Sequence, residues 1–229
     1  STMWVAPNGI VLREISPQGF ESKKETRETA QDMGAEITSI SNFITLSIVK
    51  TEREIADSKN KKTAQYKLAN LRTPELIPQD HRQRLVDAGP PKNNTYAVVL
   101  TVKSEPAQPV KPVILPIKLF PEKAWLADTP EIQSDHPLIR SLTKLIVKEE
   151  SNSWIAAQAI NEWVFKNLEK VLVDNATALD TLRTRQGECQ SHTNLFVALA
   201  RAAGIPARVI NGLVYSKEYG GFVYHAWPE

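Results

Sequence analysis

The residues best suited to chemistry are one cysteine and one of the four histidines of the chain. Cys189 is the single cysteine, and His225 follows it later in the sequence. A thiol and an imidazole from separate elements can carry out acyl transfer, because the imidazole takes the thiol proton and later protonates the leaving amine. A lone cysteine is also often a small buried hydrophobic residue, so the elements around the two side chains must decide between these interpretations.

The pattern of residues 189–203 predicts a helix that begins at the cysteine. Five positions fall on one helical face, which we expect to be buried: Cys189, His192, Phe196, Leu199 and Ala203. Gly187 permits a tight turn before the helix, and Gly204 supplies a left-handed C-terminal cap. Cys189 then lies in the first turn, where unpaired amides carry a partial positive charge. Such a position lowers the pKa of a thiol, and the same amides can donate to an oxyanion.

The second candidate residue lies in a predicted hairpin that follows this helix. Residues 208–214 and 222–227 read as two strands joined by a loop rich in turn-forming residues. In the second strand Val223, His225 and Trp227 share one face. If the helix of the cysteine packs on that face, the imidazole can reach the thiol. The alternative is a half-buried histidine that a neighbouring residue stabilises.

Other polar residues compete for roles at this site. His192 lies one turn from Cys189, but two side chains of one helix leave little room for a substrate between them, so packing beside the site is favoured. A metal site formed by Cys189, His192 and His225 would match the three-ligand pattern of catalytic zinc, but nothing in the sequence supplies its supporting shell and we expect none. Gln190 either lines the oxyanion pocket or faces solvent. Arg201 and Arg208 favour structural salt bridges.

The first part of the chain reads as β-rich. Residues 3–5 and 10–15 flank the turn signal Pro7-Asn8-Gly9 and suggest a hairpin, and residues 26–33 read as a short helix. Further strands are expected at 44–49, 63–68, 83–87 and 96–102, the last being the most apolar. Five prolines then fall within residues 105–121, where regular central structure is disfavoured.

Helical periodicity follows the prolines. A helix after Asp135-His136-Pro137 is expected to bury Leu138, Leu142, Leu145 and Ile146, and a helix over 153–168 is expected to bury Ala156, Ile160, Trp163 and Val164. A short helix is expected over 178–184. We therefore divide the chain into a β-rich N-terminal accessory domain (1–104), a Pro-rich linker (105–121) and a mixed core (122–229).

Composition excludes some classes of protein. The 229 residues carry a formal net charge of +2, which argues against a nucleic-acid binder with its usual basic face. No apolar run approaches the roughly 20 residues of a membrane-spanning helix, so we expect no direct membrane insertion. The first residues show no signal peptide, although an upstream export signal is compatible with them.

Several motifs now identify a family. They are Gly187-Glu188-Cys189, the run LFVALARAAGIPAR over residues 195–208, Gly212-Leu213-Val214-Tyr215 and Tyr224-His225-Ala226-Trp227. This order resembles the core of the transglutaminase-like superfamily, over roughly residues 120–229 and most closely its bacterial and archaeal cysteine-protease-type members. The resemblance implies an α+β, papain-like fold in which helices pack on an antiparallel sheet. It also implies Cys189 as nucleophile, His225 as base and no cofactor.

The sequence departs from the family pattern at its third catalytic residue. Family members place an aspartate on the strand after the His-Ala-Trp segment, whereas the printed sequence stops at Glu229. Asp174 and Asp180 precede the cysteine and do not match the motif, and Glu229 is too near His225 in sequence. We therefore expect a chain truncated before the triad aspartate, which lowers activity because the imidazole loses its preferred tautomer.

The function that these features predict is acyl transfer at a peptide or carboxamide bond through a thioester, by a protease, an amidase or a transglutaminase. A protein or peptide is the expected substrate, and an exported, periplasmic or extracellular location is favoured over the cytoplasm. The alternative is a non-catalytic binding or scaffold protein that retains the fold, with the β-rich part as its recognition domain. The sequence leaves the oligomeric state open.

Overall fold

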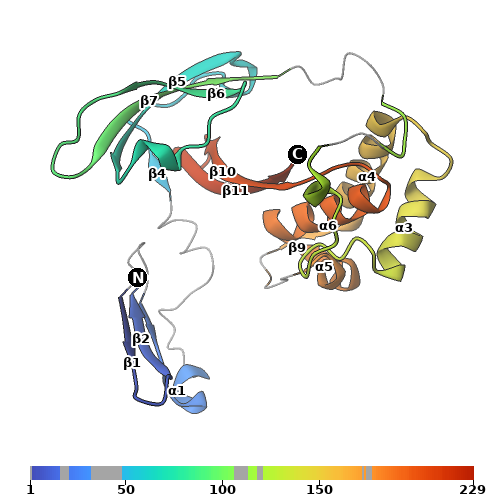
Figure 1. Ribbon diagram of the computed structural model, residues 1–229, viewed down its shortest axis with the longest axis horizontal. Coiled ribbons are helices and arrows are strands. Elements are labelled where there is room, and N and C mark those ends of the chain that lie inside the picture. The colour runs from blue at the N-terminus through green and yellow to red at the C-terminus, as the bar shows by residue number, and fades with distance from the viewer. Residues whose placement is uncertain are drawn as a thin grey trace. The chain divides into compact units, whose positions relative to one another are not determined.

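The computed structural model describes residues 2–15, 21–31, 48–105, 113–117, 121–171, 173 and 177–229 (Figure 1). The chain forms two compact units, Ser1–Leu46 and Ser47–Glu229. This division falls within the expected accessory domain rather than at the prolines. Residues 106–112 and 118–120 of the expected linker lie outside the described residues. The division into 1–104, 105–121 and 122–229 therefore stays a prediction.

The first unit contains the predicted N-terminal hairpin. Strands β1 (Thr2–Val5) and β2 (Val11–Ile15) pair antiparallel, and β3 (Glu21–Lys23) pairs with β2. Gly9 closes the turn in the left-handed region at φ 81°, where glycine has no steric penalty. Helix α1 (Arg27–Gln31) lies within the helix expected at 26–33. Residues 32–33, and 44–47 of an expected strand, lie outside the described residues.

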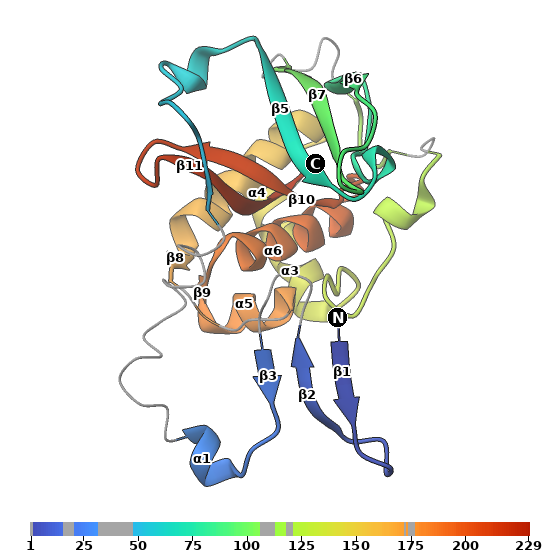
Figure 2. The ribbon, with the colours of Figure 1, turned by 90° about the vertical axis from the view of Figure 1, so that its left-hand side faces the viewer.

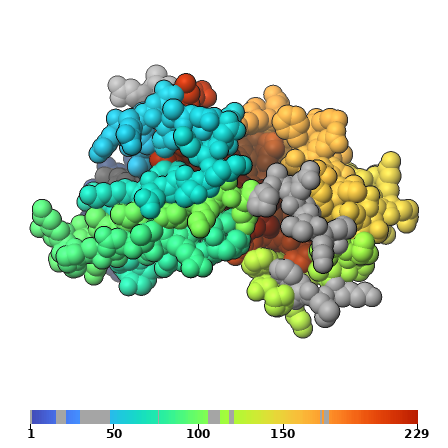
Figure 3. All heavy atoms as spheres, turned by 90° about the horizontal axis from the view of Figure 1, so that it is seen from above, coloured from blue at the N-terminus to red at the C-terminus, as the bar shows by residue number. Residues whose placement is uncertain are grey.

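The second unit contains an antiparallel sheet of order β5-β7-β6. Its strands are β5 (Thr63–Leu71), β6 (Gln83–Ala88) and β7 (Tyr96–Lys103), each at the position that the sequence predicts. The central strand β7 is the most apolar, and its Val98 and Leu100 are buried. In the space-filling view this sheet gathers on one side of the picture as cyan and green atoms, and the yellow and orange helices gather on the other (Figure 3).

Three helices follow at the positions predicted from sequence. They are α3 (Pro137–Val147), α4 (Ser153–Asn167) and α5 (Ala178–Thr184), and the side chains of His136, Asn152 and Thr177 cap their first turns. Short 3-10 turns at Ser58–Asn60, Pro74–Leu76 and Lys123–Trp125 connect other elements. Among the described helices, none is long and apolar enough to cross a membrane.

The buried face of α3 differs from the prediction. Ile139 and Thr143 are its buried residues, whereas Leu145 is 73% exposed and Leu138 is half exposed. The buried face of α3 predicted from leucine spacing is therefore partly wrong. The core cluster packs against the side of α3 that carries Ile139. On α4 the prediction is confirmed, since Ala156, Ile160 and Val164 are buried and Trp163 packs against the core.

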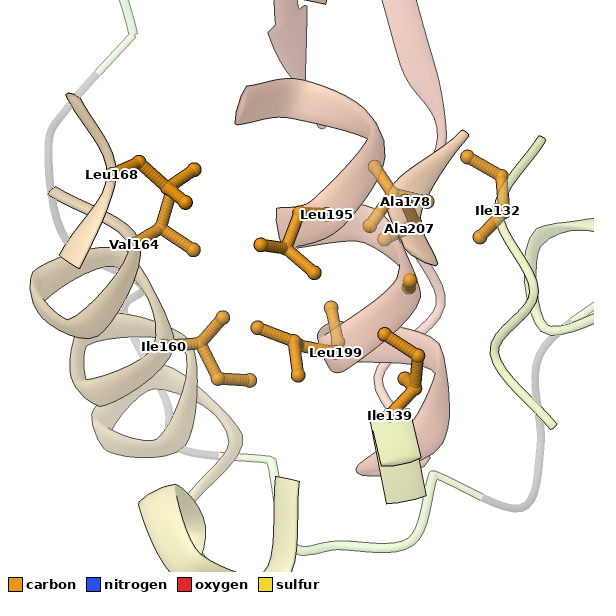
Figure 4. Close-up of a cluster of buried hydrophobic side chains, with 12 residues drawn as sticks. Ile132, Ile139, Ile160, Val164, Leu168, Ala178, Leu195, Leu199 and Ala207 are labelled. Atoms are coloured by element: carbon orange, nitrogen blue, oxygen red, sulfur yellow. The ribbon is translucent and has the colours of Figure 1, made fainter. Parts of the chain in front are cut away.

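Helix α6 (Cys189–Ala202) is the centre of the second unit. Its residues Leu195 and Leu199 meet Ile160 and Val164 of α4 and Ile139 of α3 (Figure 4). The helix is buried almost all round, and its fully enclosed side chains are Ser191, Thr193, Asn194, Leu195, Val197, Ala198, Leu199 and Ala200. The sequence predicted that the face with Cys189, His192, Phe196, Leu199 and Ala203 is buried. In the structure Leu199 is buried and the other four residues are partly exposed. An amphipathic pattern could not show this, because partners surround α6 on several sides.

The C-terminal end of α6 confirms the predicted glycine cap. Gly204 has φ 79°, its N–H donates to Arg201 O, and Ile205 N–H donates to Ala200 O at 2.9 Å. These two bonds are the Schellman pattern, which satisfies the last carbonyl groups of a helix. The chain then passes into strand β10.

Strands β10 (Val209–Ser216) and β11 (Gly221–Pro228) form the predicted antiparallel hairpin, in which Gly212 pairs with His225. Strand β4 (Val49–Lys50) pairs with the start of β11, at Gly221 and Phe222. Beyond these two residues, no other described strand pairs with the outer edge of β11. The hairpin lies beside α6 (Figure 2). The second unit is thus an α+β fold of helices and antiparallel sheets, as predicted.

Candidate active site

A glycine sets how closely the chain approaches the first turn of α6. Strand β9 (Gln186–Gly187) pairs in parallel with β8 (Glu169–Lys170) and leads directly into the helix. A Cβ atom at Gly187 would lie 2.4 Å from Cβ of Ser191, a distance that real side chains do not reach. Glycine is required here for this close approach. The turn that the sequence suggested at this position is not the reason, because Gly187 is not among the glycines with positive φ.

Glu188 caps the helix with its carboxylate. Oε2 accepts from the Gln190 N–H at 2.8 Å, and Oε1 accepts from the Ser191 N–H at 2.9 Å and from the Ser191 hydroxyl at 3.0 Å. The thiol of Cys189 also donates to Oε2, at 3.2 Å. An anion at a helix N-terminus is favourable because the free amides there carry partial positive charge. Sequence reasoning treated Glu188 only as a flanking residue; its acidic side chain directly before the predicted helix was the available signal.

The sulfur of Cys189 lies against strand β11. The backbone N–H of Ala226 lies near it and lowers the pKa of the thiol. Arg208 and Glu229 exchange both backbone hydrogen bonds across the hairpin, at 2.7 and 2.9 Å. Because every second amide of an antiparallel strand faces its partner, the amide of Glu229 and every second amide before it in β11 face β10. The amide of Ala226 therefore points to the outer edge of β11. The thiol approaches the strand from that edge.

His225 is the residue directly before this amide. Its ring stacks on Trp227 at a centroid separation of 6.4 Å, and both project from the face of Gly212. Trp227 lies close over Gly212, where a Cβ would come within 2.6 Å of the indole. The sheet face that turns to the helical core is the opposite one, which carries buried Ala226 and, in β10, Val209.

The structure therefore brings Cys189 and His225 onto contacting elements without joining them. The sulfur reaches the peptide unit that links His225 to Ala226, but among the described residues no hydrogen bond connects the thiol to the imidazole. The pairing of the two side chains across the helix–strand contact stays a prediction.

The thiol pKa differs from the sequence-based expectation. Burial raises the pKa of Cys189, and the hydrogen bond and negative charge of Glu188 raise it further, against the lowering effect of the Ala226 and Gln190 amides. The net shift of the pKa is upward. The helix start lowers a thiol pKa when its amides are free, but here the Glu188 carboxylate takes the amides of Gln190 and Ser191. The expectation of a lowered thiol pKa was therefore wrong.

The pKa of the His225 imidazole is shifted in the opposite direction, downward. Burial lowers the pKa of His225, the positive charge of Lys170 lowers it further, and Glu188 opposes both. Burial also raises the pKa of Tyr224, with contributions from Cys189 and Glu188, which places its phenol in the same electrostatic environment. At neutral pH the site therefore holds a neutral thiol and a neutral imidazole.

The polar residues of α6 have structural partners. The Nδ1 atom of His192 is hydrogen-bonded to the carbonyl of Glu188 at 2.8 Å, as expected for a histidine that packs beside the site. The side-chain amide of Gln190 donates to Asn194 at 2.8 Å, within the helix. Neither observation supports His192 as base or Gln190 as a side-chain oxyanion donor.

The remaining charged candidates also have structural roles. Arg201 donates to the carbonyls of Ala207 and Ala127 at 2.9 and 2.5 Å. Arg208 pairs with Glu229 and lies 4.2 Å from the centre of the Trp125 ring. Asp180 accepts from the Thr177 hydroxyl at 2.6 Å and so belongs to the cap of α5.

Asp174 lies outside the described residues. Within the described part of the chain no carboxylate is hydrogen-bonded to the ring of His225. The same residues contain no cluster of three or more His, Cys, Asp or Glu side chains that could hold a metal ion.

Comparison with known proteins identifies the domain that carries this site. Residues 140–229 match the family model of the transglutaminase-like superfamily. The match contains both Cys189 and His225. These residues form a transglutaminase-like domain. The match begins within α3 and extends through β11.

One solved structure is similar to the chain in fold, and one relative is similar to it in sequence. A crystal structure of a candidate cysteine protease from Cytophaga hutchinsonii aligns with a TM-score of 0.53 and 18% identity, over 73% of this chain and 70% of that chain. An uncharacterised protein of Haemophilus influenzae is 35% identical over 98 residues. That alignment covers 39% of this chain and 26% of the relative, so the chain spans about a quarter of the relative's length.

Proposed function

We propose that the transglutaminase-like domain is a cysteine acyl-transfer enzyme in which Cys189 is the nucleophile and His225 is the base. One observation carries the proposal. The sulfur of Cys189, at the start of α6, lies near the peptide unit that follows His225 on β11, whose N–H lowers the pKa of the thiol. Cys189 thereby lies near the strand that carries His225, and the family match covers both residues.

The mechanism follows from the protonation states. As the Cys189 sulfur forms a bond to a carboxamide or peptide carbonyl carbon, its proton passes to His225, which is neutral because burial lowers its pKa. His225 then gives this proton to the leaving amine as the carbon–nitrogen bond breaks, and a thioester remains. Water or a second amine attacks the thioester, loses its proton to His225 and releases the thiol, which recovers that proton.

The developing oxyanion needs hydrogen-bond donors near the sulfur. The amides of Gln190 and Ser191 are occupied by the Glu188 carboxylate. The amide of Cys189 is not among the groups that Glu188 binds. We therefore assign the Cys189 N–H as the oxyanion donor from the helix.

The substrate class is a peptide or a glutamine-type carboxamide. The thiol lies beside Tyr224, which is about half exposed, so a chain lying along the outer edge of β11 would reach the sulfur. The similarity in fold to a candidate cysteine protease favours hydrolysis over cross-linking. An exported or extracellular location stays a prediction.

The experiment compares the chain with its Cys189→Ala and Cys189→Ser variants on a mixed peptide library, with and without an added primary amine. We expect Cys189→Ala to lose on the order of 1,000-fold or more in kcat/KM, as removal of a nucleophile does. New peptide termini indicate hydrolysis, and amine incorporation indicates cross-linking. Equal turnover by the unsubstituted chain and Cys189→Ala would exclude Cys189 as nucleophile.

A binding or scaffold function is the second candidate, and the resting site favours it in one respect. The thiol donates to Glu188 rather than to His225, and burial keeps it protonated. A scaffold would show no turnover in any variant while retaining peptide binding. Peptide capture by Cys189→Ala, measured by calorimetry in parallel with turnover of the unsubstituted chain, separates the two functions.

A further inference from the structure

The contact between Glu188 and Cys189 places a carboxylate against the thiol. Both oxygens of Glu188 are engaged, Oε2 by the Gln190 amide and the Cys189 sulfur, Oε1 by the amide and hydroxyl of Ser191. Four donors hold the carboxylate in one orientation. The thiol is therefore the donor of its hydrogen bond to Oε2, since a carboxylate has no hydrogen to give.

The same carboxylate cancels the helix effect that would activate the thiol. Amides at a helix start stabilise a thiolate when they face it. Here two of those amides bind an anion that lies 3.2 Å from the sulfur. Loss of the thiol proton would leave two negative groups at hydrogen-bond distance, which is an unfavourable arrangement.

Glu188 remains ionised in this position. Burial would raise its pKa, but the hydrogen bonds from the amides of Gln190 and Ser191 and from the side chains of Cys189 and Ser191 outweigh burial, so the pKa of Glu188 is lowered. The other groups near the thiol are Tyr224 and His225 of β11, His192 of α6, and, facing His225, Lys170 of β8. Among the charged groups that affect the pKa values of Cys189 and His225, Lys170 is the one cation. It lowers the pKa of His225 and is not among the groups that shift the pKa of Cys189.

We propose that Glu188 is a positioning residue that holds Cys189 as a protonated thiol, with its hydrogen directed to the carboxylate, until His225 takes over as proton acceptor. This inference deepens the proposed function and rests on it only for the identity of that acceptor. The thiol must exchange one hydrogen-bond partner for another before it attacks. Glu188 thereby sets the pH range in which the thiol reacts.

The test is the pH dependence of alkylation by iodoacetamide, which reports only Cys189 because the chain has no other cysteine. In the unsubstituted chain we expect the midpoint of the rate profile to lie above that of a cysteine in a short unstructured peptide with blocked ends. In Glu188→Gln the midpoint moves to lower pH and alkylation at pH 7 becomes faster, because the side chain loses its charge. The matched control is Glu169→Gln, which removes an exposed carboxylate that accepts from Gln186 at 2.9 Å and leaves the midpoint unchanged.

Loss of the helix cap is a separate effect that a second variant isolates. Serine is a favoured N-cap residue, so Glu188→Ser retains a cap for α6 while it removes the carboxylate. We expect the same downward shift of the midpoint, with far-UV circular dichroism verifying the helix. An unchanged or higher midpoint in these variants, or a midpoint of the unsubstituted chain below that of the blocked cysteine peptide, would overturn the proposal. Alkylation needs no turnover, so this outcome is independent of the Cys189→Ala comparison.

Discussion

At the scale of single residues, the site is defined by two pKa shifts in opposite directions. Burial raises the pKa of Cys189 and lowers the pKa of His225, so the neutral forms of both are favoured. A resting thiolate–imidazolium pair is therefore disfavoured, and the proposed mechanism uses His225 as a general base during attack. Glu188 belongs to this description because its charge raises both pKa values.

The pH profile of turnover tests the state of the imidazole. His225 must be neutral to accept a proton, so kcat/KM falls as the pH drops through its pKa, which lies below the ordinary value of 6.5. The positive charge of Lys170 contributes to that lowering. In Lys170→Met the pKa of His225 rises, and the acid limb moves to higher pH. Lys166→Met is the control, because Lys166 pairs with Glu162 on the exposed side of α4. An acid limb that stays in place in Lys170→Met contradicts this assignment.

At the scale of elements, the start of α6 is positioned by close contacts on both sides. Strand β9 approaches the first turn at Gly187, and the edge of β11 meets the sulfur through the Ala226 amide. The helix itself is held by the core cluster around Leu195 and Leu199. Cys189 thus lies on an element held by the core, while contacts with β9 and β11 set the direction of its side chain.

Gly187→Ala tests the close approach of β9. The added methyl group would lie 2.4 Å from the Ser191 Cβ, so the first turn of α6 must shift. Overpacking of this kind costs about 1–3 kcal/mol of unfolding free energy, measured by urea denaturation. Gly89→Ala is the control, since a Cβ there meets nothing within 4 Å, and we expect a change within about 0.5 kcal/mol. Equal stabilities of the two variants would show that Gly187 is not tightly packed.

At the scale of the whole molecule, the second unit joins regions from both sides of the proline-rich segment. Arg82, next to β6, forms an ion pair with Glu229 at the end of β11, and the same carboxylate pairs with Arg208. Tyr66 of β5 meets Phe222 of β11 edge to face at 5.3 Å. The sheet of β5, β6 and β7 therefore contacts the hairpin that carries His225.

The core of the second unit is centred on α6 and its neighbours, and Ile160→Ala tests it. Ile160 is fully buried between α4 and α6, so its truncation leaves a cavity and costs about 2–5 kcal/mol. Leu145→Ala is the control, because Leu145 is 73% exposed, and its cost stays within about 0.5 kcal/mol. Thermal unfolding of both variants measures the difference. A larger loss of stability in Leu145→Ala than in Ile160→Ala would support the buried face of α3 that leucine spacing predicted.

Much of this arrangement is readable from the sequence alone. The helices α3 to α6, the hairpin of β10 and β11 and the sheet of β5 to β7 follow from local periodicity and caps, as Gly204 and Pro137 illustrate. The pairing of Cys189 with His225 came from the motifs and stays a prediction. The faces of α3 and α6 could not be read, because burial depends on which neighbours surround a helix.

Only the tertiary structure decided the electrostatics of the site. A cysteine at a helix start predicts a lowered pKa if nothing else lies nearby. Here burial and the Glu188 carboxylate instead raise the pKa of Cys189. The sulfur lies at the edge of β11, near the Ala226 amide. Sequence patterns record which side chains lie on one element, whereas a pKa is set by every charge and dipole that folding brings within reach.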